Sequence, residues 1–248
     1  MFVPIGDTQV TGGYKPYVSY SLIVINIVIF IIQYQTPGNL VCDLSTIPSD
    51  IIQGRSLHTL ISSMFLHGSW MHLLGNMVFL WVFADNIEAR IGSVPFLIFY
   101  LLGGLIAGFS HIWFSTYNVD LTQIQCLPCS LINPCGDSEE HVAAAVIPSL
   151  GASGAIAAVL GAYLTMFPRS RIRVLVLILF RSFYLPAIVF LGIWFIQQLF
   201  YGIGSLSPDF SGDDSIAWWT HIGGFVFGVI AGLFFRLKYN DSERTFAY

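Results

Sequence analysis

The chain has 248 residues, of which 55% are hydrophobic and only 10% are charged, and its formal net charge is −4. A soluble domain usually carries about 25% charged residues, so this composition excludes one. The mean hydropathy of +0.73 and the long, nearly charge-free runs indicate a helical membrane protein with several spans. No basic cluster in the sequence suggests nucleic-acid binding, and we therefore expect no nucleic-acid partner.

Apolar runs divide the chain into six predicted membrane spans. These spans are residues 17–34, 70–83, 95–114, 149–167, 185–201 and 216–235. Residues 51–65 mix apolar and polar positions at helical spacing, which is typical of an amphipathic segment in the membrane interface. The run 174–180 is too short to cross, because a span needs about 20 residues. We expect an all-α protein with a membrane domain over residues 17–235 between short polar tails at 1–16 and 236–248.

The basic residues predict how the chain is oriented in the membrane. Six spans place both tails on one side, and that side holds nine of the ten lysine and arginine residues. The other side holds only Arg55. The positive-inside rule therefore predicts that both termini are cytoplasmic and that the long loops face outward. We expect a multi-pass integral protein of the cell membrane, inner or plasma.

Polar residues occur at the same depth in three of the spans. Spans two, four and six enter from the outer face, and their first turns carry His72 with Asn76, Ser153, and His221, respectively. Because a helix rises about 1.5 Å per residue, each residue lies within about 10 Å of the outer end of its helix. Polar residues inside a membrane are costly and are functional candidates by default. We therefore expect these four side chains to converge.

Small residues beside these positions favour close packing. In span six, Gly224 and Gly228 follow His221 by three and seven residues, and span four carries a similar small-residue stripe from Gly154 onward. Such stripes let two helix backbones approach closely in a membrane. Gly151, just before span four, leaves the backbone N–H groups near the serine open to a reacting group. We expect spans four and six to pack backbone to backbone.

This arrangement predicts acyl-transfer chemistry. A serine within hydrogen-bond reach of a histidine is a nucleophile beside a general base, and Ser153 with His221 would form such a pair. The spans that carry the pair have no acidic residue at this depth, so a dyad is favoured over a triad. His72 and Asn76 share one helix face and, with the Ser153 backbone N–H, would bind an oxyanion. His67 is expected to pack in the outer loop and help to fix it.

Other interpretations of the same residues were open. An intramembrane histidine often bonds a neighbouring carbonyl, and Asn76 would equally serve as interhelical glue. His67, His72 and His221 would suit zinc, but that site would lack a general base and leave Ser153 unexplained. A transporter with a proton path is disfavoured, because the polar set sits at one end of the helices. We expect no metal and no cofactor.

The motifs resemble the rhomboid family of intramembrane serine proteases. Order, spacing and topology agree over about residues 15–237. The matching segments are Phe-Leu-His-Gly-Ser-Trp-Met-His-Leu-Leu-Gly-Asn at 65–76, Glu-Ala-Arg-Ile-Gly at 88–92, Gly-Ala-Ser-Gly at 151–154, and His-Ile-Gly-Gly at 221–224 with Gly228. The resemblance implies a six-transmembrane-helix rhomboid bundle.

The resemblance also implies the roles of the site residues. Ser153 would be the nucleophile, His221 the general base, and His72, Asn76 and the Ser153 N–H the oxyanion site. The partners would be the lipid bilayer and transmembrane protein substrates, cut near the outer face. The alternative is a catalytically inert rhomboid-like protein that escorts membrane clients. Such relatives typically lack the serine or the histidine, and this chain keeps both.

Two positions depart from the family pattern. Many relatives carry Trp-Arg in the first outer loop where this chain has His58-Thr59, so its loop anchoring is expected to differ. Some relatives stack an aromatic residue, four after the serine, on the catalytic histidine. Ala157 occupies that place here, so another group must orient His221.

The four cysteines map to the predicted outer side. They are Cys42, Cys126, Cys129 and Cys135. An even count in an oxidising compartment favours disulfides, and free thiols are also compatible. A zinc site formed by the last three cysteines with His141 has tolerable spacing but is disfavoured. The sequence indicates no oligomeric state.

Overall fold

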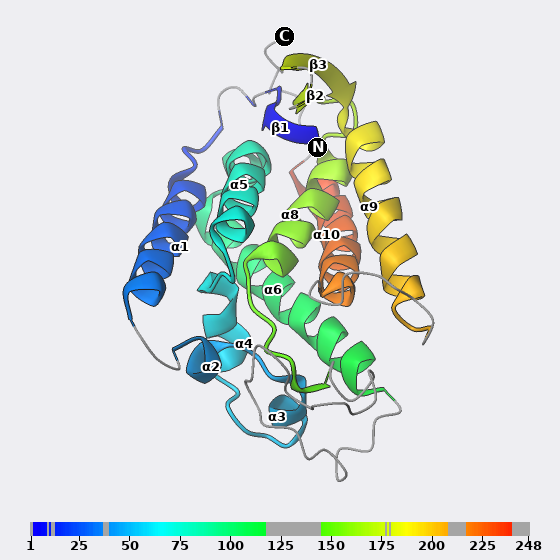
Figure 1. Cartoon of the computed structure of the whole chain (residues 1–248). Coiled ribbons are helices and arrows are strands. Elements are labelled where there is room, and N and C mark those ends of the chain that lie inside the picture. Colours follow the sequence, from blue (N-terminus) through cyan, green and yellow to red (C-terminus); the bar gives the residue numbers. More distant parts are fainter. Residues whose placement is uncertain are drawn as a thin grey trace.

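The computed structural model describes residues 2–8, 10, 13–36, 40–117, 145–176, 178, 180–207 and 217–239. Most of these residues are helical (Figure 1). The longer helices are α1 (Tyr17–Gln35), α5 (Trp70–Ile91), α6 (Ser93–Thr116), α8 (Ser153–Met166), α9 (Ala187–Gly204) and α10 (Trp218–Lys238). The short helical segments are α2 (Leu40–Leu44), α3 (Pro48–Ile52), α4 (Thr59–Ser62) and the 3₁₀ helix η1 (Ser63–Phe65). The strands are β1 (Phe2–Gly6), β2 (Arg171–Val176) and β3 (Arg181–Pro186).

Four of these helices are long and apolar enough to cross a membrane. They are α1, α6, α9 and α10. α5 is as long but carries more polar residues, and α8 is apolar but has only 14 residues. The described part of the chain is therefore a mostly helical bundle with four membrane-span candidates, and the six-span count stays a prediction.

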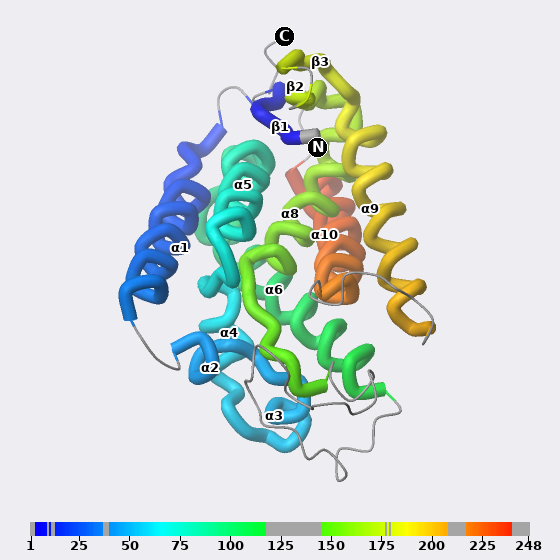
Figure 2. The backbone as a smooth tube through the Cα atoms, viewed as in Figure 1, coloured from blue at the N-terminus to red at the C-terminus, as the bar shows by residue number. Residues whose placement is uncertain are grey.

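α8 forms the centre of the bundle, between α5, α6, α9 and α10 (Figure 2). Every residue from Gly154 to Tyr163 is buried. A Cβ atom added at Gly161 would lie 2.1 Å from the Phe225 carbonyl oxygen, and one added at Gly228 would lie 1.9 Å from that of Ala158. The backbones of α8 and α10 thus approach each other at a separation that only glycine permits at these positions.

α5 extends further than the sequence predicted. The predicted span ended at residue 83 and was followed by a charged turn with Asp85, Glu88 and Arg90, but the helix continues to Ile91 and includes all three. Glu88 is fully buried. Its carboxylate accepts hydrogen bonds from the first turn of α1 and from the Ser93 hydroxyl. The charge is tolerated because these donors replace water.

A three-stranded antiparallel sheet in the order β1-β2-β3 closes one end of the bundle (Figure 1). The sequence analysis missed it, because it treated residues 1–16 as a tail and 174–180 only as a run too short to cross. In β2, Ile172 and Val174 are fully buried while Arg171 and Arg173 are exposed. This alternation has the period of a strand with one buried face and was visible in the sequence.

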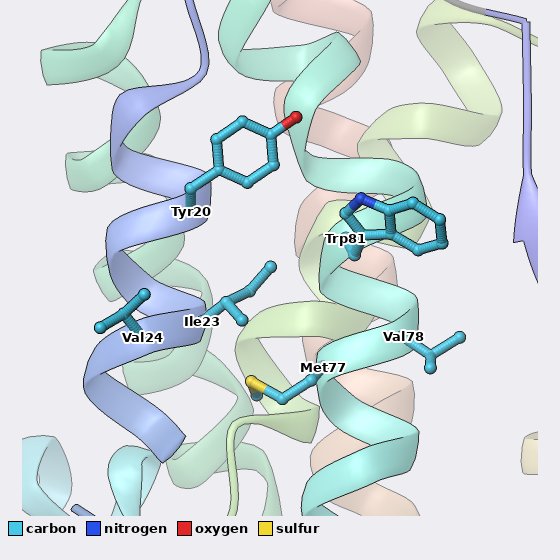
Figure 3. Close-up of a pocket in the computed structure, with 6 residues that line it drawn as sticks. All are labelled: Tyr20, Ile23, Val24, Met77, Val78 and Trp81. Carbon is cyan, nitrogen blue, oxygen red and sulfur yellow. The ribbon is translucent and has the colours of Figure 1, made fainter. Parts of the chain in front are cut away.

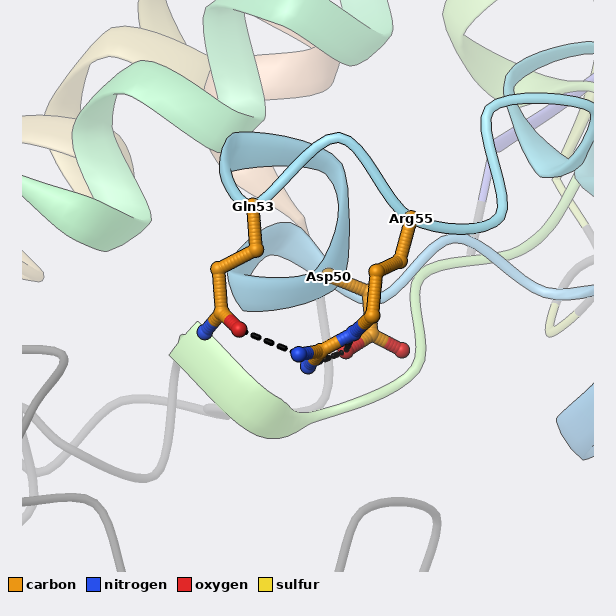
Figure 4. A network of polar contacts seen from close by, with 3 residues as sticks. All are labelled: Asp50, Gln53 and Arg55. Atoms are coloured by element: carbon orange, nitrogen blue, oxygen red, sulfur yellow. Dashed lines mark hydrogen bonds and ion pairs between the residues drawn. The ribbon is translucent and has the colours of Figure 1, made fainter.

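Residues 51–65, predicted as an amphipathic segment at helical spacing, do not form one continuous helix. α3 ends at Ile52, and positive φ angles at Gly54 (+73°) and Ser56 (+48°) interrupt the helix before α4 begins. The Arg55 side chain folds back onto Asp50 and Gln53 in this interruption (Figure 4). The region lies at the end of the bundle opposite the sheet (Figure 1).

An apolar groove of about 350 Å³ lies between α1 and α5 (Figure 3). Its lining residues are Tyr20, Ile23, Val24, Met77, Val78 and Trp81. None of these belongs to the polar set that the sequence analysis singled out.

Candidate active site

The structure brings Ser153 and His221 together at the N-terminal ends of α8 and α10. The distance from Ser153 Oγ to His221 Nε2 is 2.9 Å, which is a hydrogen bond. The two helix ends approach closely because Gly154 and Gly224 face each other. A Cβ atom added at Gly224 would lie 2.3 Å from the Gly154 carbonyl oxygen. The pair thus has the geometry of a nucleophile and its base.

The second ring nitrogen of His221 contacts a residue that the sequence analysis missed. His221 Nδ1 lies 2.8 Å from Oε1 of Gln198, a residue of α9 that is only 4% exposed. A signal was available, because Gln198 is a polar residue inside a predicted span. The search for convergent residues covered only the three spans that enter from the outer face, and this residue belongs to span five.

Two tryptophans flank the His221 ring. The ring centroid of Trp194 on α9 lies 6.0 Å away in a tilted arrangement, and that of Trp218 on α10 lies 6.4 Å away edge-on. Ala157, where some relatives carry an aromatic residue, is fully buried in α8. The described aromatic neighbours of His221 therefore come from α9 and α10 instead.

His72 and Asn76 of α5 lie against Gly151, two residues before the serine. This glycine has a φ of +124°, and a Cβ atom there would lie 2.8 Å from His72 Nε2 and 3.7 Å from Asn76 Nδ2. Asn76 Nδ2 is buried and has no hydrogen-bond partner among the described residues. His72 Nδ1 accepts a long, 3.5 Å bond from the Gly68 N–H, which leaves Nε2 as the donor toward Gly151.

The backbone adds further donors beside these side chains. Ser153 is the first residue of α8, and the first amides of a helix have no intrahelical partner. They also carry the positive end of the helix dipole. A negative charge that develops near Ser153 would therefore meet side-chain donors from α5 and backbone donors from α8.

His67 packs behind His72. Its side chain is fully buried, and its ring lies edge-on to that of His72 at 5.2 Å between centroids. Burial, and secondarily His72, lower the pKa of His67 to about 4, so the ring is neutral near pH 7. The His67 backbone exchanges two hydrogen bonds with the Gln33 side chain of α1. The loop before α5 is thereby fixed to α1.

The outer-loop segment that departs from the family pattern at His58-Thr59 is anchored by hydrogen bonds of its own. Thr46 Oγ1 donates to the Thr59 carbonyl oxygen at 2.9 Å and lies 2.9 Å from Ser63 Oγ. Thr46 also pairs with Ser149 through two backbone hydrogen bonds. The segment that contains Thr59 is thus tied to the chain that leads into Gly151 and Ser153.

The three-histidine zinc alternative has no geometric basis among the described residues. Within the described ranges, no three His, Cys, Asp or Glu residues lie close enough to hold a metal ion, so His67, His72 and His221 do not form a zinc cluster. Cys42 is disulfide-bonded. Cys126, Cys129, Cys135 and His141 lie outside the described residues.

Comparisons with known proteins agree with the resemblance seen in the motifs. A Rhomboid domain model matches residues 54–238. Presenilin-associated rhomboid-like protein A, mitochondrial, of Danio rerio is 32% identical over 50% of this chain and 25% of its own length. Rhomboid protein 1, mitochondrial, of Saccharomyces cerevisiae is 26% identical over 70% of this chain and 40% of its own. Rhomboid protease GlpG of Yersinia enterocolitica is 29% identical over 40% and 35%, respectively.

The chain thus spans less than half the length of these three relatives. The domain model, by contrast, covers about three quarters of this chain, from before α4 to the last residue of α10. It includes the Ser153–His221 pair and the residues of α5 that face it. The chain belongs to the rhomboid family.

Proposed function

We propose that this protein is an intramembrane serine endopeptidase that cleaves transmembrane segments of other membrane proteins near the outer face of the membrane. The observation that carries the proposal is the 2.9 Å contact between Ser153 Oγ and His221 Nε2. A relative whose name is rhomboid protease supports the reaction class. The six predicted spans and the basic residues of their turns support the outer face as the proposed side of cleavage.

The geometry supports an ordered sequence of steps. Ser153 Oγ attacks the scissile carbonyl carbon while its proton passes to His221 Nε2. The carbonyl oxygen becomes an oxyanion, which His72, Asn76 and the Ser153 N–H stabilise. The C–N bond then breaks as His221 returns the proton to the leaving amine. Water attacks the acyl-serine ester with the same base, and the serine is released.

The proposed membrane location rests on the predicted orientation of the chain. We propose a multi-pass protein whose two tails lie on the side rich in lysine and arginine, which is the cytoplasmic side in an inner or plasma membrane. The relatives named as mitochondrial make a mitochondrial membrane the alternative. Fractionation of the native cells, followed by antibody detection, distinguishes the two.

The test combines a serine-reactive probe with a transmembrane reporter. A fluorophosphonate should label the purified protein in liposomes, and Ser153→Ala and His221→Ala should each abolish reporter cleavage. Ser115→Ala is the matched control, because Ser115 Oγ also lies near a histidine, 3.3 Å from His111 Nδ1 in α6. That variant should keep both labelling and turnover.

Two results would contradict the proposal. Reporter cleavage by purified Ser153→Ala protein would exclude Ser153 as the nucleophile. A folded protein that binds membrane clients but neither reacts with the probe nor cleaves them would support the escort alternative. That alternative gains nothing from the present geometry, because an inert relative has no need of the Ser153–His221 hydrogen bond.

A further inference from the structure

Gln198 is a buried amide whose two ends have different partners. Its Oε1 lies 2.8 Å from His221 Nδ1, and its Nε2 donates to the Trp194 carbonyl oxygen one turn earlier in α9, at 3.4 Å. The side chain is only 4% exposed. Gln197, the preceding residue of the same helix, is exposed. Of these two adjacent glutamines, Gln198 is therefore the one that is buried beside His221.

These partners determine the proton positions. A carbonyl oxygen only accepts, so the Trp194 oxygen requires the amide nitrogen of Gln198 and leaves its oxygen facing His221. That oxygen also only accepts, so His221 Nδ1 carries the ring proton. His221 Nε2 then has a free lone pair directed at Ser153 Oγ, which donates. This is the tautomer in which His221 acts as a base.

Aromatic contacts hold α9 against α10 on both sides of this bond. Phe195 stacks on Phe225 with centroids 4.2 Å apart, and Tyr201 stacks on Trp218 at 4.7 Å. Phe195 and Tyr201 each lie three residues from Gln198, so the three share one face of α9. The amide thus lies between two stacked ring pairs, which fix its position along α9 relative to His221.

We infer that Gln198 is a positioning residue, which holds His221 in the reactive tautomer and orientation and makes the reaction depend on the packing of α9 against α10. This inference rests on the proposed function. Among the described residues, the other ionisable side chains that act on His221 are His72 on α5 and His111 on α6, and neither supplies a negative charge. A neutral amide orients the ring without the cost of burying a carboxylate.

The experiment compares two substitutions of Gln198 with the same two at Gln197. Gln198→Met removes the acceptor and keeps the volume, and it should lower kcat about 10- to 100-fold with KM nearly unchanged. The loss should be smaller than the roughly 10⁴-fold cost of losing the charged member of a triad. Gln197→Met should leave both constants unchanged. Reporter cleavage in liposomes measures all variants.

The pH profile separates positioning from mere packing. Gln198→Glu keeps an acceptor at Nδ1, so it should restore most of the turnover. Its carboxylate stabilises the imidazolium, so the acid limb of kcat/KM should move to higher pH by about one unit or more. Gln197→Glu adds a carboxylate one residue away and should move this limb much less. A structural role for Gln198 predicts no such shift.

The outcomes distinguish this inference from the proposed function. If Ser153→Ala is inactive but Gln198→Met keeps kcat within about twofold of the wild type, the positioning role is wrong. An unmoved acid limb in Gln198→Glu has the same meaning, and this measurement decides the matter if Gln198→Met does not fold. Turnover by Ser153→Ala would instead overturn the proposed function itself.

Discussion

At the scale of single residues, the amide of Asn76 is buried without a hydrogen-bond partner among the described residues. Leaving a buried donor unpaired costs about 1–3 kcal/mol, so such a group calls for an explanation. An oxyanion that forms only in the transition state supplies one. Asn76 Nδ2 faces the same glycine as His72 Nε2, one turn deeper in α5.

We predict that Asn76→Ala lowers kcat at least about tenfold, because loss of one oxyanion donor typically costs 10²–10³-fold and the remaining donors compensate in part. KM should change little, since the contact is made mainly in the transition state. Reporter cleavage and thermal unfolding should be measured on one sample. Asn26→Ala is the control, because Asn26 is also buried but its described hydrogen bond runs to the Leu22 carbonyl oxygen within α1.

If Asn76→Ala keeps full turnover, or if its loss equals its unfolded fraction, Asn76 acts as interhelical glue and His72 is the principal side-chain donor. The positions of Ser153, His72, Asn76 and His221 could be anticipated, because helix rise and orientation place them at one depth. Gln198 was missed because its span enters from the opposite face and was not searched, although it lies three residues before the predicted outer end of that span. The packing of α9 on α10 is what shows that its side chain reaches His221.

At the scale of elements, the contact between α8 and α10 depends on glycine. A Cβ atom at Gly228 would lie 1.9 Å from the Ala158 carbonyl oxygen, a backbone atom that moves only with its helix. We predict that Gly228→Ala destabilises the protein by about 1–3 kcal/mol, the usual cost of overpacking. Separation of the helices should also lengthen the Ser153–His221 hydrogen bond and reduce probe labelling.

The control for this prediction is Gly192→Ala in α9, where an added Cβ atom meets nothing within 4 Å. Alanine favours a helix over glycine by about 1 kcal/mol, so this change should be neutral or stabilising. Thermal unfolding in detergent micelles measures both variants. Equal melting temperatures for the two would show that α8 and α10 do not need their close approach.

Hydropathy predicted the helices well but failed at other elements. Predicted spans begin within about three residues of α1, α6, α9 and α10, because charge-free runs dominate there. It ended α5 too early, because Glu88 and Asp85 looked solvent-exposed when they are buried. The strands were missed because their alternation is short and β1 pairs with β2 across more than 160 residues, a contact that local pattern cannot reveal.

At the scale of the whole molecule, two polar networks, one partly and one largely buried, tie the elements together. In one, the Tyr163 hydroxyl of α8 bonds Asp7 and Ser170, and Asn86 of α5 also bonds Asp7. This network joins the segment after β1 to α5, to α8 and to the turn before β2. In the other, Glu88 joins α5 to α1 and α6. Neither contact was predictable, because each pairs residues that only the assembled bundle brings together.

The second network gives a prediction that separates stability from catalysis. The Glu88 carboxylate accepts hydrogen bonds from the Val18 N–H at 2.9 Å, the Ser19 N–H at 2.7 Å and the Ser19 hydroxyl at 2.6 Å. These amides belong to the first turn of α1 and have no partner within that helix. In Glu88→Gln one acceptor oxygen becomes an NH₂ donor. This donor would face the donor groups of Val18 and Ser19 and could not bond to them.

We expect Glu88→Gln to lower the free energy of unfolding by about 1.5–3 kcal/mol, the range for hydrogen bonds to a charged group. Turnover per active site should not change, because the described hydrogen-bond partners of Glu88 belong to α1 and α6 and not to the residues around Ser153. Thermal unfolding gives the first quantity, and active-site titration with a fluorophosphonate followed by reporter cleavage gives the second. Asp43→Asn makes the same change at an exposed carboxylate of α2 and should alter neither. A fall in turnover per labelled serine in Glu88→Gln would mean that the packing of α1 affects the active site. The connection would be the loop before α5, which is fixed to Gln33 of α1.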